Sequence, residues 1–168
     1  MSHPLDCQVY YDSTLHAAPP SSCGERIDLA SDPEAAGQLT RLGLSPQSDL
    51  PAVLLTEAGG KIRILGVRLT GEEAATLASG AGIHASTLTI YSSDWCPDCR
   101  RAKRVLEEAE APFEEVDIDR DPGAEAMVLA KSGGRRVVPT LRFDDRVWAF
   151  NPDPPLLRRL LNGRAKPA

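Results

Sequence analysis

The chain has 168 residues and a mass of 18.1 kDa, which leaves room for one large domain or two small ones. Its composition, 42% hydrophobic and 26% charged, argues against a disordered or collagen-like protein. No apolar run approaches the ~20 residues that cross a bilayer. The net charge of −5 argues against a protein that coats nucleic acid or an anionic membrane.

The excess negative charge lies in the first half of the chain. Residues 1–86 hold five Lys/Arg and ten Asp/Glu, whereas residues 87–168 hold fourteen of each. Residues 1–11 have neither the basic nor the apolar stretch of a signal peptide, which predicts a cytoplasmic protein. Four cysteines in such a chain, two of them in one C-x-x-C, favour redox chemistry or metal binding over structural disulfides.

The first half shows three short strand patterns, which begin near residues 9, 27 and 50. A last strand is expected over residues 61–67 and a last helix over residues 71–78. Residues 79–86 are small and are expected to form a flexible linker.

The second half alternates more regularly between strand and helix patterns. We expect strands over residues 87–91, 114–118, 137–143 and 146–150, and helices over residues 96–110, 121–131 and 154–161. Prolines and glycines mark the ends of these helices, and Asp144-Asp145 marks a hairpin turn. The predicted order is β-α-β-α-β-β-α.

The two halves also resemble each other. Three segments match in order: residues 9–13 with 89–93, 27–33 with 116–122, and 50–55 with 138–143. The offsets are 80, 89 and 88 residues, so the first copy is about nine residues short where the second keeps its C-x-x-C and first helix. Chance similarity of two α/β patterns is the alternative. We expect two tandem α/β folds, the first without that helix region.

The C-x-x-C lies between a predicted strand and a predicted helix. Cys96 is thereby placed at the helix N-terminus, where unpaired N–H groups and the helix dipole stabilise a thiolate. Thiols in such places have a pKa lowered from about 8.5 into the ~3.5–7.5 range. Cys99, one turn later, can close an intramolecular disulfide, so Cys96 would attack a substrate disulfide and Cys99 would release the product. A zinc half-site and an inert pair are the alternatives, although the other cysteines and histidines lack a ligand spacing.

A second signal is the proline at the start of the strand predicted over residues 137–143. Proline removes a donor from a strand ladder, so Pro139 is unusual there. A cis peptide before it would turn the backbone of Val138 toward Cys96, ready to pair with an extended substrate thiol. An edge-strand proline without such a role is the alternative.

These motifs make residues 87–164 resemble glutaredoxins, which have the thioredoxin fold, and in particular the mycoredoxin-like glutaredoxins of bacteria. The residues that carry the resemblance are 95–99, 132–140 and 151–152. The resemblance implies reduction of protein disulfides or mixed disulfides with a low-molecular-weight thiol. It also implies a set of substrate-binding residues: Trp95, Arg135, Arg136, Val138, Pro139, Asn151 and Pro152. For Arg136, a solvated loop charge is an equal alternative.

The resemblance leaves the electron donor open. Glutathione-using members carry a Gly-Gly and an acidic residue after the last strand, where this chain has residues 150–153, Phe-Asn-Pro-Asp. Mycothiol, bacillithiol, glutathione, a protein thiol or a flavoprotein reductase therefore stay candidates, and no bound cofactor is expected. Pro97 directly after Cys96 argues against an iron–sulfur cluster shared between subunits.

Residues 1–78 resemble a thioredoxin-like domain without an active site. His16 falls where Cys96 lies in the second copy, and Pro51 keeps the place of Pro139. Such a domain would be a docking or dimer surface, with Cys23 a relay thiol or a plain loop cysteine. The leading hypothesis is a cytoplasmic thiol–disulfide oxidoreductase that acts on oxidised client proteins. The alternatives are a redox-sensing adaptor, whose first domain binds a client, and a structural zinc module.

Overall fold

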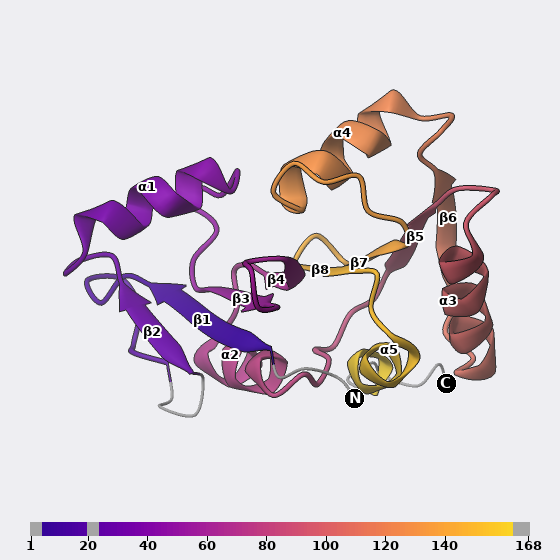
Figure 1. The fold of residues 1–168 in the computed structure, drawn as a ribbon. Coiled ribbons are helices and arrows are strands. Elements are labelled where there is room, and N and C mark those ends of the chain that lie inside the picture. Colours follow the sequence, from indigo (N-terminus) through magenta and orange to yellow (C-terminus); the bar gives the residue numbers. More distant parts are fainter. Residues whose placement is uncertain (1–4, 20–23, 163–168) are drawn as a thin grey trace. The chain divides into compact units, whose positions relative to one another are not determined.

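The computed structural model describes residues 5–19 and 24–162 (Figure 1). Contacts within the chain divide it into two compact units, Met1–Ser79 and Gly80–Ala168. No helix in the described residues has the length and apolar character needed to span a bilayer. Each unit is considered by itself below.

The first unit contains a four-stranded mixed sheet and two helices. Its elements are β1 (Asp6–Tyr11), β2 (Glu25–Asp28), α1 (Pro33–Arg41), β3 (Ala52–Thr56), β4 (Ile62–Gly66) and α2 (Gly71–Ala78). The strand order is β2-β1-β3-β4, in which β1 is parallel to β2 and antiparallel to β3. Both helices begin at a capped residue: the Asp32 carboxylate accepts the Glu34 N–H, and Thr70 forms a capping box with Glu73.

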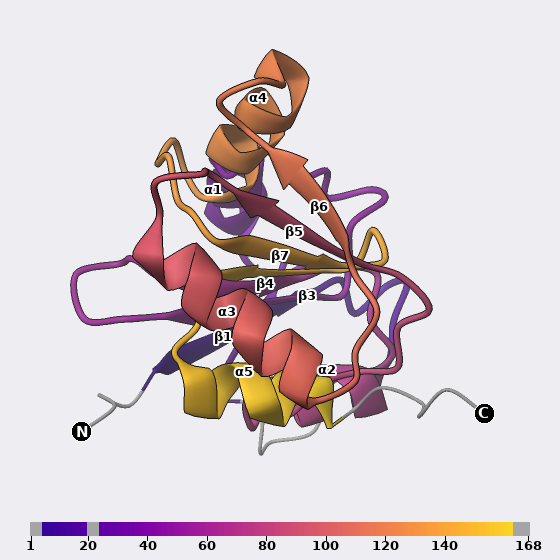
Figure 2. The same cartoon turned by 90° about the vertical axis from the view of Figure 1, so that its right-hand side faces the viewer.

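The second unit repeats this pairing pattern and has one more helix. Its elements are β5 (Leu88–Ser92), α3 (Pro97–Glu108), β6 (Glu114–Asp117), α4 (Pro122–Lys131), β7 (Thr140–Phe143), β8 (Val147–Phe150) and α5 (Pro154–Leu161). The strand order is β8-β7-β5-β6, with β5 parallel to β6 and antiparallel to β7. Helices α3 and α5 lie together on one face of this sheet and α4 lies on the other (Figures 1 and 2).

A mixed α/β fold is thus confirmed, and the second unit has the predicted element order. Strand β7 is shorter than predicted, because the chain turns at Val138-Pro139 and pairs only from Thr140 onward. Between β1 and β2, the described residues 12–19 and 24 form no helix. That the first unit is a shortened copy of the second stays a prediction.

The segment expected to be a flexible linker packs on the second unit. The Gly82 N–H donates to the Arg159 carbonyl at 3.2 Å, and Ile83 and Ala85 are buried. An added Cβ at Gly82 would overlap the carbonyl of Leu160, so only glycine allows this approach. The N–H of Ser86 donates to the Asp144 carboxylate. Residues 80–86 are therefore part of the second unit rather than a free tether.

Candidate active site

The two cysteines of the C-x-x-C form a disulfide at the start of α3, with Cα atoms 5.3 Å apart. Cys96 is the N-cap of the helix, and its Sγ accepts the backbone N–H of Cys99 at 3.0 Å. Pro97 occupies the first helical position, where its fixed φ favours the helix and its missing N–H costs nothing. The predicted placement of Cys96 at a helix N-terminus is confirmed. A thiolate formed there on reduction has a backbone donor already in place.

The loop before β7 lies against this disulfide. The Val138–Pro139 peptide is cis, as expected, and the carbonyl oxygen of Val138 lies 3.8 Å from Sγ of Cys96. Pro139 is buried, and the Thr140 hydroxyl donates to the Val137 carbonyl at 2.9 Å. The backbone of Val138 therefore lies beside Sγ of Cys96, and its role in binding substrate stays a prediction.

Asn151 joins the two loops that form the site. Its backbone N–H donates to the Pro139 carbonyl at 2.8 Å, and its amide Nδ2 donates to Asp98 at 3.4 Å. Asp98 also pairs with Arg101 at 2.9 Å. Pro152, the next residue, is buried. The structure thus brings Asn151 to the C-x-x-C, although its role in binding substrate stays a prediction.

The remaining predicted substrate-binding residues differ in their exposure and in their contacts. Trp95, directly before Cys96, exposes 63% of its surface. Arg135 is half-buried, and its carbonyl accepts the Ser132 hydroxyl. The Arg136 guanidinium is held in ion pairs with Asp119 and Glu125. Hydrogen bonds to Glu125 and then to Asp119 raise the pKa of Arg136 above its ordinary value. Arg136 is thus an exposed loop residue whose charge is paired, and its role in binding substrate stays a prediction.

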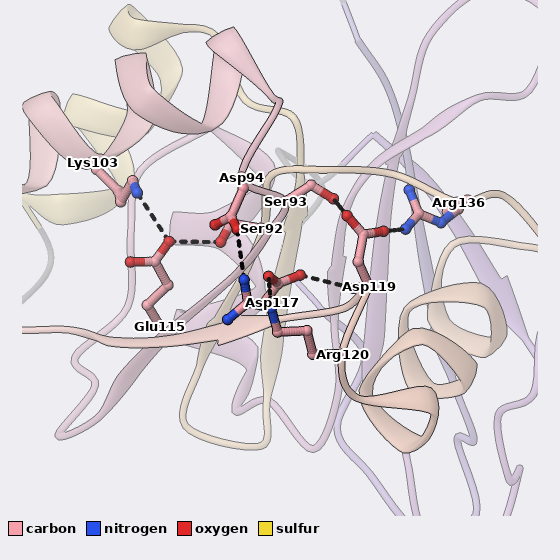
Figure 3. Close-up of polar contacts among 9 residues, drawn as sticks. All are labelled: Ser92, Ser93, Asp94, Lys103, Glu115, Asp117, Asp119, Arg120 and Arg136. Atoms are coloured by element: carbon pink, nitrogen blue, oxygen red, sulfur yellow. Dashed lines mark hydrogen bonds and ion pairs between the residues drawn. The ribbon is translucent and has the colours of Figure 1, made fainter.

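A polar network around the loop before Cys96 was not predicted from the sequence (Figure 3). The hydroxyl of Ser93 donates to Asp119 at 2.9 Å, and the Cys96 N–H donates to the Ser93 carbonyl at 3.2 Å. Arg120 lies 3.0 Å from Asp94 and 3.4 Å from Asp117. The alternation of Asp117, Asp119 and Asp121 after a predicted strand is the sequence signal that could have indicated this network.

A second part of the network links α3 to the sheet. Glu115, in β6, accepts hydrogen bonds from Lys103 at 2.9 Å and from Ser92 at 2.7 Å (Figure 3). The hydrogen bond from Lys103, followed by that from Ser92, lowers the pKa of Glu115. Likewise, the hydroxyl of Ser93 is the main cause of the lowered pKa of Asp119. Both carboxylates stay ionised near neutral pH and fix the loop that leads into Cys96.

The described residues hold no group of three or more His, Cys, Asp or Glu side chains that could ligate a metal ion. In the first unit, His16 is half-buried. Its backbone N–H donates to the Asp12 carbonyl at 2.8 Å, whereas its imidazole Nδ1 has no hydrogen-bond partner. The Leu50–Pro51 peptide is cis, like Val138–Pro139. Cys7 is half-buried in β1, and Cys23 lies outside the described residues.

Comparison with known proteins gives matches confined to part of the chain. A family model described as Glutaredoxin matches residues 88–148, within the second unit. Mycoredoxin 1 of Corynebacterium glutamicum is 40% identical over 67 residues, which cover 40% of this chain and 82% of that protein. The glutaredoxin-like protein NrdH of Escherichia coli is 34% identical over 67 residues, 39% of this chain and 80% of that protein. The structure of the Escherichia coli NrdH-redoxin matches with 30% identity and a TM-score of 0.39, over 49% of this chain and 97% of that one.

Proposed function

Because this chain belongs to the glutaredoxin family, we propose that it reduces protein disulfides or mixed disulfides with a low-molecular-weight thiol through Cys96 and Cys99. The family makes the protein a thiol–disulfide oxidoreductase. The observation that carries the assignment of roles is the hydrogen bond at 3.0 Å from the Cys99 N–H to Sγ of Cys96. The cytoplasm, where such dithiols are kept reduced, is the compartment proposed.

In the proposed reaction the reduced protein starts with a thiolate on Cys96. This thiolate attacks one sulfur of the substrate disulfide; a Cys96–substrate disulfide forms, and the other substrate sulfur leaves as a thiolate that takes up a proton. Cys99 then loses its proton and attacks Sγ of Cys96. The Cys96–Cys99 disulfide forms and the second substrate thiol is released, so the protein is oxidised by two electrons as the substrate is reduced.

Three features of the site support this order of attack. Cys96 caps α3, so its thiolate is the one that faces unpaired backbone N–H groups. The Val138 carbonyl, 3.8 Å from Sγ, can accept the N–H of an extended substrate chain beside the attacked sulfur. Trp95 adds an exposed aromatic surface next to the nucleophile. Val138, Asn151 and Trp95 are therefore the residues proposed to contact substrate.

Turnover tests the proposal directly. The purified chain should reduce a mixed disulfide such as that of hydroxyethanethiol over many cycles, with glutathione, mycothiol, bacillithiol or a flavoprotein reductase with NADPH as the electron source. Reduction with a small thiol supports the glutaredoxin-like reaction. Reduction by the flavoprotein alone would keep the dithiol chemistry and refute the small-thiol donor. A single stoichiometric oxidation without turnover would favour the redox-sensing adaptor instead.

Two serine variants separate the roles of the cysteines. Cys96→Ser should abolish turnover, because no other sulfur can form the mixed disulfide. Cys99→Ser should keep part of the activity toward small mixed disulfides, since a second thiol can release the substrate from Cys96. Cys7→Ser, in the first unit, is the matched control and should leave turnover unchanged. Equal loss in Cys96→Ser and Cys99→Ser would contradict the monothiol route.

For the first unit we propose a degenerate thioredoxin-like copy, residues 1–78, that docks a client protein. Two observations support this. Its strands pair as in the second unit, with the first parallel to the second and antiparallel to the third. The sequence matches between the halves also fall on equivalent strands, β1 with β5 and β3 with β7. The acidic balance of residues 1–86 suits a basic client.

A further inference from the structure

Arg136 lies two residues before Val138 and is a cation beside the proposed substrate path. Two carboxylates hold its guanidinium: Asp119, which Figure 3 shows, and Glu125 at 2.9 Å. All three side chains are about one third exposed, so both ion pairs lie at the surface. Since one cation faces two anions, the cluster as a whole carries a negative charge. An anionic group on a substrate would therefore meet a guanidinium whose charge these two carboxylates already offset.

Asp119 also reaches the opposite side of the site. Its Oδ2 accepts the Ser93 hydroxyl at 2.9 Å. Asp119 is itself fixed, because its backbone N–H donates to the Asp117 carboxylate at 2.8 Å. One carboxylate thus ties the loop that precedes Cys96 to the loop that precedes Val138.

We propose that Asp119 is a specificity-determining residue that withholds Arg136 from the electron donor and so disfavours thiols that carry carboxylates. The inference rests on the small-thiol reaction proposed above and adds the charge class of the donor. A donor such as glutathione, with two carboxylates and one ammonium, brings a net negative charge toward a cluster that is already negative, and two carboxylates already offset the charge of Arg136. An uncharged thiol meets no such penalty. The ion pair between Asp119 and Arg136 therefore favours uncharged low-molecular-weight thiols as electron donors.

The ion pair between Asp119 and Arg136 would affect the step in which a donor thiol opens the Cys96–Cys99 disulfide. A donor thiolate attacks Sγ of Cys96; the donor–Cys96 bond forms, the Cys96–Cys99 bond breaks, and Cys99 leaves as a thiolate that takes up a proton. A second donor thiolate attacks the donor sulfur, forms the donor disulfide and releases Cys96. Two donor thiols are oxidised as the protein disulfide is reduced.

The test is a stoichiometric measurement on the oxidised full-length chain. The rate constant of disulfide opening is measured with glutathione and with uncharged 2-mercaptoethanol, and their ratio is compared between variants. The ratio cancels any change in the reactivity of the disulfide itself, which a merely structural role would alter for both thiols alike. In Asp119→Asn the ratio should rise about two- to fivefold, the size of an exposed ion pair. Raising the salt to ~1 M should remove the gain.

Two further variants make the result decisive. Asp119→Asn combined with Arg136→Gln should return the ratio to that of the unchanged chain, because the guanidinium, then paired with Glu125 alone, is the cause of the gain. Asp145→Asn removes the same charge at the other end of β7, and should leave the ratio unchanged. The proposal is overturned if the ratio in Asp119→Asn stays constant or falls, if the gain persists in the double variant, or if Asp145→Asn gives the same gain. The assay needs no turnover, so a failure of the proposed function would show separately in the steady-state assay.

Discussion

At the scale of single residues, the site depends on residues that make two contacts each. Sγ of Cys96 bonds to Cys99 and accepts that residue's backbone N–H. The backbone N–H of Asn151 holds the Val138-Pro139 loop through the Pro139 carbonyl, and its side chain holds Asp98. Backbone N–H groups therefore contact both the sulfur of Cys96 and the loop that lies against it.

Titration of the Asp144 carboxylate should make the free energy of unfolding depend on pH. Its carboxylate accepts the N–H groups of Ser86 and Thr87 and the Thr87 hydroxyl, at 2.8 to 3.2 Å. Burial acts to raise the pKa of Asp144, but the hydrogen bonds from Thr87 and Ser86 together lower it. Because the folded pKa is lower than the unfolded value of about 3.9, the carboxylate stabilises the fold above that pH. This contribution is lost as the pH falls through the folded pKa.

We expect Asp144→Gly to lower the free energy of unfolding at neutral pH by about 1–2 kcal/mol. Glycine is chosen because Asp144 has a φ of +50°, which alanine would adopt only with strain. Asp144→Asn keeps an acceptor oxygen and tolerates the same φ, so it should lose less. Urea denaturation between pH ~7 and ~3 measures the effect, and the difference from the unchanged chain should shrink toward acid pH. A difference independent of pH would contradict the account.

At the scale of secondary-structure elements, the bounds of helices could be predicted because the residues that mark them lie within the same short segment of sequence. Helices α2 and α5 have the predicted bounds, since Thr70 and Pro154 mark their starts within the same short segment. Cys96 at the N-cap of α3 follows from Pro97 in the same way. The Asp117, Asp119 and Asp121 pattern could indicate a polar network, but the partners of Asp119 could not be identified, because Ser93, its hydrogen-bond donor, and Arg136, its ion-pair partner, lie 26 and 17 residues away. Nor could the packing of residues 80–86, which depends on a tertiary approach of Gly82 to α5.

Gly82 and Gly37 give a matched pair of substitutions. Gly82→Ala should destabilise the second unit by about 2 kcal/mol or more, because its Cβ would meet the main chain of Leu160, which cannot move without α5. Gly37→Ala, within α1, meets no atom within 4 Å and should stabilise by about 0.5–1 kcal/mol, since alanine favours helix. Thermal unfolding of the two variants checks the signs. An unchanged melting temperature in Gly82→Ala would show that α5 does not pack against this segment.

At the scale of the whole molecule, two units of similar strand pairing carry different charge and different chemistry. The dithiol, the Val138-Pro139 loop and the acidic network all lie within Gly80–Ala168. The excess negative charge lies in residues 1–86, apart from the reaction centre in the sequence. We therefore expect catalysis and client docking to be separable.

A fragment of residues 80–168 should fold and keep turnover toward a small mixed disulfide. A fragment of residues 87–168 should unfold at a lower temperature, because it lacks the Gly82–Arg159 hydrogen bond, the buried Ile83 and Ala85, and the Ser86 donor to Asp144. Circular dichroism melts and the turnover assay compare the two fragments. Equal melting temperatures would restore the view of residues 79–86 as a simple linker.

The central claim is that Cys96 ionises near neutral pH because it caps α3. Its most direct test is the rate of alkylation by iodoacetamide against pH, in a chain whose Cys7, Cys23 and Cys99 are replaced by serine. The account predicts a midpoint for Cys96 below the ~8.5 of a free cysteine, and a return toward that value when the chain is unfolded in urea. A midpoint of the folded chain at or above that of the unfolded chain would contradict it.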